Sequence, residues 1–213
     1  MSRRIPVTKK LGRPPDVDSA TTRNNLLEVA RRIFARDGYG ATTNRSIADE
    51  AGITTAAIYH YFPSKAELYA AVYEVVQHKV YDRFELSLTK PGSLTKRFSW
   101  TLDAAVELNR SDSSIAGFIV TVPSELQRHP ELVDLVLSIR SRTATFLNRL
   151  VADAEAAGEF APGVQPRAVE DLLNAVLSGL AIFSTVIGDA DRHDQAIRAL
   201  QLFLAGELVN EGL

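Results

Sequence analysis

Residues 43–62 read TNRSIADEAGITTAAIYHYF and predict two short helices joined by a tight turn. Thr43 and Thr54 can each cap the start of a helix, because a threonine hydroxyl accepts a hydrogen bond from an unpaired amide of the first turn. Gly52 suits the left-handed position that ends the first helix. Two short helices around such a turn are typical of a helix-turn-helix, whose second helix enters the major groove of DNA.

The segments on either side of this pair are also predicted to be helical. Apolar residues between positions 23 and 37 recur on one helical face, and we expect this helix to pack behind the pair. On the other side, Ser64 and Glu67 have the spacing of a capping box. They predict a long helix that runs to about residue 87 and links the pair to the rest of the chain.

As a continuous pattern, residues 23–73 resemble the DNA-binding domain of TetR-type (tetracycline-repressor-like) transcriptional regulators. The residues that carry this resemblance are Leu26, Leu27, Ala30, Ile33, Phe34, Gly38, Tyr39, Thr42, Thr43, Ile47, Ala48, Ala51, Gly52, Ile53, Ile58, Tyr59, Tyr61, Phe62, Ser64, Lys65, Glu67 and Leu68. Ala56 departs mildly from the pattern, because the family often has glycine or another small residue there. For the remaining two thirds of the chain the resemblance implies a helical fold without naming a ligand.

The rest of the sequence predicts further helices and no sheet. Helices are expected over about residues 93–110, 113–122, 130–157, 166–187 and 191–210, with Pro123 ending the second of these. No alternating strand pattern is present. The prediction is an all-α fold of about nine helices, divided into a basic arm (1–19), a helix-turn-helix domain (20–66) and a helical ligand-binding and dimerisation domain (67–213).

Composition excludes several classes of site. The 213 residues are 46% hydrophobic and include no cysteine, which rules out disulfides, thiolate metal sites and a cysteine nucleophile. Neither a signal peptide nor an apolar run of about 18 residues is evident. We therefore expect a cytoplasmic protein with no membrane partner.

Charge is divided unevenly along the chain. Residues 1–65 carry a net charge of +5 and the remainder a net charge of −7, as expected if the basic end meets DNA phosphates. Residues 1–15 hold five basic residues and no acidic ones. Gly12, Arg13 and Pro14 resemble the centre of an AT-hook, in which the arginine enters the minor groove. A solubilising tail that touches phosphates loosely is the alternative, and both interpretations stay open.

Candidate DNA contacts follow from the geometry of a helix in the major groove. The candidates for base contact are Arg45, Thr55, Ala56 and His60, since threonine and alanine methyls can meet thymine methyls and arginine can bind guanine. By resemblance to the family, the candidates for phosphate contact are Thr43, Tyr59 and Lys65. The predicted set is completed by Arg13 in the arm and by Thr54, which caps the second helix of the pair, called the reading helix below.

A pocket for a mostly apolar small-molecule effector is implied by the family among the middle helices. The helix of residues 93–110 is apolar on two faces, so it is either buried or lines a cavity. The predicted lining residues are Tyr73, Val76, Phe98, Trp100, Leu102, Phe118, Ile119, Val122, Arg140, Phe146, Leu177 and Phe183. A fatty acyl, steroid-like or drug-like molecule would suit them, and a packed core without a cavity is the alternative.

The last two predicted helices carry apolar stripes wider than one partner helix needs. We expect a two-fold interface to which each chain contributes two helices, and a pseudo-palindromic operator. The predicted interface residues are Leu173, Val176, Leu180, Ile187, Ile197, Leu200, Phe203 and Leu204.

Three functions are weighed. A dimeric repressor released from double-stranded DNA by a ligand is the leading hypothesis, and a DNA-binding regulator without a small-molecule switch is the second. An enzyme is the third, but no phosphate loop or nucleophile elbow is present. Glu74, His78 and Asp82 share one helical face, which we interpret as a solvated polar face because no second histidine has ligand spacing. No cofactor and no metal are expected.

Overall fold

The computed structural model describes residues 15–139 and 141–209, which contain ten α-helices, one short 3-10 helix and no strand. This confirms the all-α prediction. The elements are α1 (Pro15–Ala41), α2 (Asn44–Ala51), α3 (Thr55–Tyr61), α4 (Lys65–Leu88), α5 (Leu94–Ser111), α6 (Ser114–Arg128), η1 (Pro130–Leu132), α7 (Val133–Leu137), α8 (Ser141–Ala156), α9 (Pro166–Ile187) and α10 (Ala190–Ala205).

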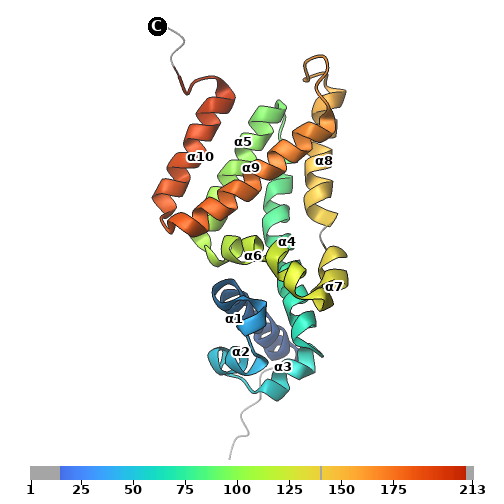
Figure 1. The fold of residues 1–213 in the computed structure, drawn as a ribbon, viewed down its shortest axis with the longest axis vertical. Coiled ribbons are helices and arrows are strands. Elements are labelled where there is room, and N and C mark those ends of the chain that lie inside the picture. Colours follow the sequence, from blue (N-terminus) through green and yellow to red (C-terminus); the bar gives the residue numbers. More distant parts are fainter. Residues whose placement is uncertain (1–14, 140, 210–213) are drawn as a thin grey trace, which may run out of the picture.

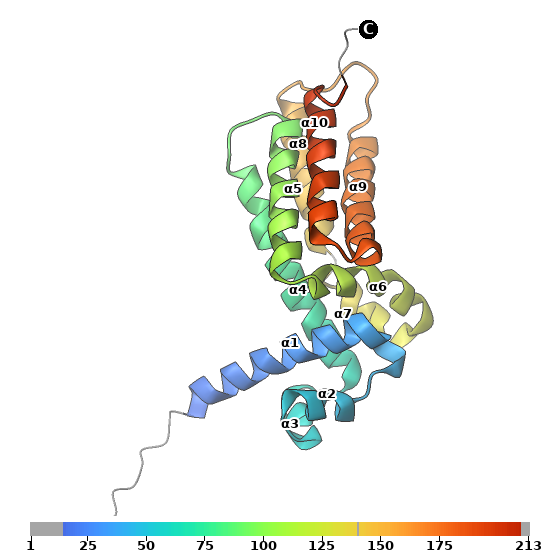
Figure 2. The same ribbon diagram turned by 90° about the vertical axis from the view of Figure 1, so that its left-hand side faces the viewer.

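The helices form two parts joined by α4. Helices α1 to α3 lie at one end of the molecule, α5, α8, α9 and α10 lie at the other, and α4 runs from one part into the other (Figure 1). Helix α6 lies between the upper helices and α1, which crosses beneath them (Figure 2). An aromatic cluster fills this junction: the ring of Tyr69 on α4 lies 5.0 Å from both Phe34 on α1 and Phe118 on α6.

The helix starts predicted around the turn are confirmed. Thr43 Oγ1 accepts a hydrogen bond from the Ser46 amide at 3.0 Å, and Thr54 Oγ1 accepts one from the Ala57 amide at 3.2 Å. Gly52 ends α2 in the left-handed conformation, with φ at 67°. Each signal acts within a few residues, which is why the sequence predicts this part of the fold so closely.

Several predicted boundaries are wrong. Helix α1 begins at Pro15, inside the arm expected over residues 1–19, and α10 ends at Ala205 instead of about residue 210. Helix α6 continues through Pro123 to Arg128 instead of ending at the proline. Proline removes one helical hydrogen bond, and the packing of α6 between α1 and the upper helices outweighs that loss. The long helix expected over residues 130–157 is instead divided into η1, α7 and α8.

Helix α9 presents an apolar surface outward. By length and composition alone it could cross a membrane, and 11% of its most apolar stretch is buried inside the described chain. This differs from the expectation that no segment would meet that criterion. The exposed side chains include Leu172, Ile182 and Val186 on α9 and Phe203 on α10. Large apolar side chains exposed on two neighbouring helices are typical of a surface that another molecule covers.

Candidate DNA interface and ligand cavity

The reading helix α3 turns a small, specific set of side chains outward. Ile58 is fully buried against the other helices, whereas Ala56 and His60 are exposed and Tyr59 exposes 54% of its surface. Thr55 is half-buried. All four predicted contacts on α3 therefore lie on or beside its outer surface, in the geometry that a helix needs to meet base edges and phosphates.

The flanking candidates surround this surface. Thr43 and Thr54 are exposed, and their hydroxyls also cap α2 and α3. Arg45 is exposed, with Nε 4.0 Å from Asp49 Oδ2 on the next turn. An exposed ion pair at this distance is weak, so Asp49 does not hold the guanidinium in place, and the contact of Arg45 with a base stays a prediction. Arg13 lies outside the described residues.

Lys65 has a structural task that the sequence did not reveal. Its Nζ donates to the carbonyl oxygens of Tyr39 at 2.7 Å and Thr42 at 2.8 Å, and it lies 4.1 Å from the centre of the Tyr39 ring. Burial lowers the pKa of this ammonium. Lys65 thus ties the start of α4 to the chain that leaves α1. Its role at a phosphate stays a prediction, for which one N–H remains.

A cavity of about 460 Å³ lies among α4, α5, α6, α8, α9 and α10. This volume falls within the range of about 300–1,000 Å³ that is typical of small-molecule sites. Four of the predicted lining residues lie on its wall: Tyr73, Ile119, Val122 and Leu177. The wall also includes apolar side chains that the prediction omitted, among them Val80, Phe84, Leu108, Ile115 and Leu147.

The other predicted lining residues are not placed on the cavity wall. Buried core positions are taken by Val76, Phe98, Leu102, Phe118 and Phe146. Trp100 and Phe183 are half-buried elsewhere, and two lysine ammonium groups cover the Trp100 ring. Arg140 lies outside the described residues. Large aromatic side chains fill the core because they bury the most apolar area, so hydrophobicity alone does not separate core from wall.

Polar residues on the wall are the part that sequence reasoning missed. Gln77 on α4 exposes 3% of its surface, and its Oε1 has no hydrogen-bond partner. On α5, Asn109 Nδ2 lies 3.4 Å from His193 Nδ1 of α10, while Asn109 Oδ1 has no partner. The available signal was the position of Gln77 between Val76 and Val80 on an otherwise apolar helix face. Buried amide oxygens in proteins are almost always hydrogen-bonded, so the oxygen of Gln77 calls for a donor.

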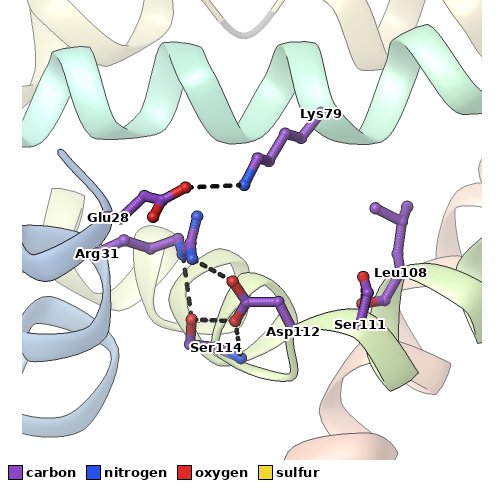
Figure 3. Close-up of polar contacts among 7 residues, drawn as sticks. All are labelled: Glu28, Arg31, Lys79, Leu108, Ser111, Asp112 and Ser114. Carbon is purple, nitrogen blue, oxygen red and sulfur yellow. Dashed lines mark hydrogen bonds and ion pairs between the residues drawn. The ribbon is translucent and has the colours of Figure 1, made fainter. Parts of the chain in front are cut away.

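The cavity is connected to the reading end through α6 and α4. Arg31 on α1 is almost fully buried, pairs with Asp112 Oδ2, and donates from Nε to Ser114 Oγ at 3.1 Å (Figure 3). Asp112 and Ser114 form the turn from α5 into α6. In the same view, Lys79 Nζ on α4 lies 3.6 Å from Glu28 Oε1 on α1. Helices that line the cavity, α4 and α6, are thus also in direct contact with α1.

The predicted polar face of α4 carries no metal cluster among the residues described. His78 and Asp82 instead contact Arg142 of α8, whose Nη2 donates to Asp82 Oδ1 at 2.7 Å. These groups fasten α8 to α4.

The predicted interface residues lie on both sides of α9 and α10. Leu173 and Ile197 face the interior and are buried, so they are not available to a second chain in this conformation. Five are half-buried, namely Val176, Leu180, Ile187, Leu200 and Leu204. Phe203 exposes 65% of its surface. Exposed apolar residues outside the predicted set include Leu172, Ile182, Val186 and Leu202, because an apolar stripe does not reveal which side meets its own core.

Comparison with known proteins agrees with this geometry. Residues 26–72 match the family model described as "Bacterial regulatory proteins, tetR family", and residues 95–209 match "BetI-type transcriptional repressor, C-terminal". The regulator UidR of Escherichia coli strain K12 is 22% identical over 182 residues, covering 85% of this chain and 88% of its own. The repressor KstR2 of Mycolicibacterium smegmatis is 34% identical over 95 residues, or 44% of this chain and 46% of its own.

Solved structures share the fold. FadR from Bacillus subtilis, solved in complex with stearoyl-CoA, superposes with a TM-score of 0.69 at 18% identity, covering 89% of this chain and 98% of that one. Since the two family models span the reading helices and more than half of the chain, this protein belongs to the TetR family of bacterial regulatory proteins and is a DNA-binding transcriptional regulator.

Proposed function

We propose that the protein is a homodimeric, cytoplasmic repressor that leaves a pseudo-palindromic operator when a small, mostly apolar ligand enters the cavity. The observation that carries this proposal is the position of the cavity. Its wall includes residues of α4 and α6, and these two helices also hold α1 through Lys79 and through the turn at Asp112 and Ser114. A ligand there touches the elements that position the reading helix.

The mechanism follows from differential binding. A ligand that prefers an arrangement of α4 and α6 in which the two reading helices are wrongly spaced weakens DNA binding by the same free energy. A coupling of about 3 kcal/mol lowers operator affinity by about 150-fold. Two structural neighbours support a ligand with a large apolar part: FadR from Bacillus subtilis is described in complex with stearoyl-CoA, whose acyl chain is apolar, and KstR2 from Mycobacterium tuberculosis as a ketosteroid regulator.

Dimerisation is supported by the outward surface of α9 and α10. Val186 exposes 79% and Phe203 65% of their surfaces, although side chains of this size are normally buried. Pairing that surface with its own copy would remove it from water and form a four-helix interface. The two reading helices would then face successive major grooves.

The DNA proposal is tested by selecting bound duplexes from a random library at near-physiological salt. We expect a pseudo-palindrome whose half-sites are about one helical turn, or a multiple, apart. The double variant Thr55→Ala, Tyr59→Ala should lose this enrichment, whereas the matched control Glu107→Ala, an exposed residue of α5, should retain it. Failure of the unaltered protein to enrich any sequence would contradict the proposal.

The ligand proposal is tested separately by thermal shift against a library of apolar small molecules. A ligand present at 100 times its Kd stabilises the folded state by about 2.7 kcal/mol, which is readily detected. Compounds that raise the Tm should also release the selected duplex. If stabilising compounds leave DNA binding unchanged, the protein is a regulator without a small-molecule switch.

A further inference from the structure

Two amide side chains on the cavity wall, Gln77 and Asn109, each have an oxygen without a hydrogen-bond partner. Gln77 is one of the few polar side chains among the buried residues, and its Oε1 makes no hydrogen bond. Buried amide oxygens are almost always paired in folded proteins. Because Gln77 lines the cavity, a molecule bound there could supply the missing hydrogen-bond donor.

Asn109 presents a second acceptor, and its orientation is held by His193. The buried imidazole of His193 faces Asn109 Nδ2 with its Nδ1 at 3.4 Å. Because an amide nitrogen can only donate, His193 Nδ1 accepts this hydrogen bond and carries no proton. Burial also lowers the pKa of His193, which favours the neutral ring. The NH₂ group of Asn109 is thus used, and its Oδ1, which has no partner, is left for a donor.

Charge on the wall disfavours an anionic group. Among the lining residues that the structure describes, the cation is Arg167, since His193 is neutral. Arg167 Nη1 lies 3.0 Å from Glu170 Oε2 and Nη2 lies 3.3 Å from Asp171 Oδ1, and both carboxylates also line the cavity. A ligand carboxylate would meet two acceptor oxygens, Gln77 Oε1 and Asn109 Oδ1, that cannot donate to it, and the cation on the wall is already shared by two carboxylates.

We propose that the cavity recognises a neutral, mostly apolar ligand through its hydroxyl groups, which donate to Gln77 Oε1 and Asn109 Oδ1. This inference rests on the proposed ligand cavity and adds the chemical class of the ligand. A hydroxyl supplies the donor that each oxygen lacks without bringing a charge. The apolar remainder of the ligand would lie against Val80, Leu108, Ile119 and Leu147 on the same wall.

The test uses three straight-chain probes of similar length that differ at one end: 1-decanol, decyl methyl ether and decanoate. Binding to the full-length protein is measured by titration calorimetry at pH 7.5. We expect 1-decanol to bind about tenfold more tightly than the ether, which cannot donate, because one net hydrogen bond is worth about a factor of ten. Decanoate should bind more weakly than 1-decanol.

Two variants connect this preference to the named oxygens. Gln77→Leu and Asn109→Leu each replace an acceptor with an apolar group of similar size. At least one should lose most of the preference for 1-decanol while still binding the ether. The matched control is Ser184→Ala, because the Ser184 hydroxyl lines the cavity but already donates to the Ala181 carbonyl at 2.8 Å. This control should keep the preference.

The outcomes separate the two proposals. If the probes bind with equal affinity, if decanoate binds most tightly, or if both folded leucine variants keep the alcohol preference, the hydroxyl inference is overturned and the apolar cavity stands. If none of the probes binds, the ligand cavity of the proposed function is contradicted as well. Thermal unfolding of each variant verifies that it is folded.

Discussion

Replacing Asp112 by asparagine should cost more stability than replacing its partner Arg31 by methionine. The two side chains form an ion pair between α1 and the turn into α6, but Arg31 exposes 2% of its side chain and Asp112 exposes 29%. Asparagine keeps the size of Asp112 and removes its charge. The guanidinium would then remain buried without its counter-ion, a situation that costs about 3–5 kcal/mol.

Replacing Arg31 by methionine should lower the stability much less, because no unpaired charge stays buried. Methionine retains the apolar packing of the arginine stem and takes the charge out of the interior. Asp112 stays partly hydrated, and its Oδ1 still accepts from the Ser114 amide at 3.1 Å and the Ser114 hydroxyl at 2.6 Å. We expect a loss of about 1 kcal/mol, mainly from the missing hydrogen bond to Ser114. The double variant should resemble Arg31→Met alone, so the coupling between the two sites should be about 3–5 kcal/mol, the full cost of Asp112→Asn.

Urea unfolding at one fixed protein concentration measures all four free energies, and the fixed concentration keeps the contribution of dimerisation equal among the variants. The decisive quantity is the difference between the two single variants. If Arg31→Met proves the more destabilising of the two, or if Asp112→Asn costs less than 1 kcal/mol, burial of the cation does not control this contact and the reasoning is refuted.

Three further predictions concern other parts of the fold. Gly38 has φ at 77°, and an added Cβ would lie 2.8 Å from Glu125 Oε1, so Gly38→Ala should lower the free energy of unfolding in urea by about 1–3 kcal/mol. Gly117→Ala is the control, because its Cβ would lie at an ordinary 3.6 Å from Ala35 and should cost little. Equal effects of the two substitutions would contradict the argument. Burial lowers the pKa of His193 below its ordinary 6.5, so the unfolded chain takes up the proton first. The stability contributed by the neutral ring is complete above pH 6.5 and falls as the pH drops below that value. Between pH 7.5 and 5.5 the Tm of the unaltered protein should therefore fall more than the Tm of His193→Gln, and parallel losses would count against this role. Val186→Glu, on the outward face of α9, should yield monomers by sedimentation while the chain stays folded, and a persistent dimer would place the interface elsewhere.

Much of the reading end was predictable from sequence because its signals are local. The hydroxyl of Thr43 acts on an amide three residues away, and Gly52 needs only its own backbone conformation. The same holds for Thr54 and for the exposed face of α3, since α2 and α3 are too short to offer alternative packings. Lys65 is the exception: its carbonyl partners lie 23 and 26 residues earlier in the chain, and no spacing rule connects them.

What only the tertiary structure decided is which side of each apolar helix meets its own core. Leu173 is buried while the adjacent Leu172 is exposed, and Phe118 fills the junction while Ile119 lines the cavity. The hydrophobic effect depends on area and has no direction, so an apolar stripe shows that a face is covered without showing what covers it. The sequence alone therefore indicated the family, most of the helices and the local signals around the turn, but not the course of α6 through Pro123 or the division of residues 130–157. The arrangement of the neighbouring helices determined the core, the cavity with its unpaired amides and the outward surface.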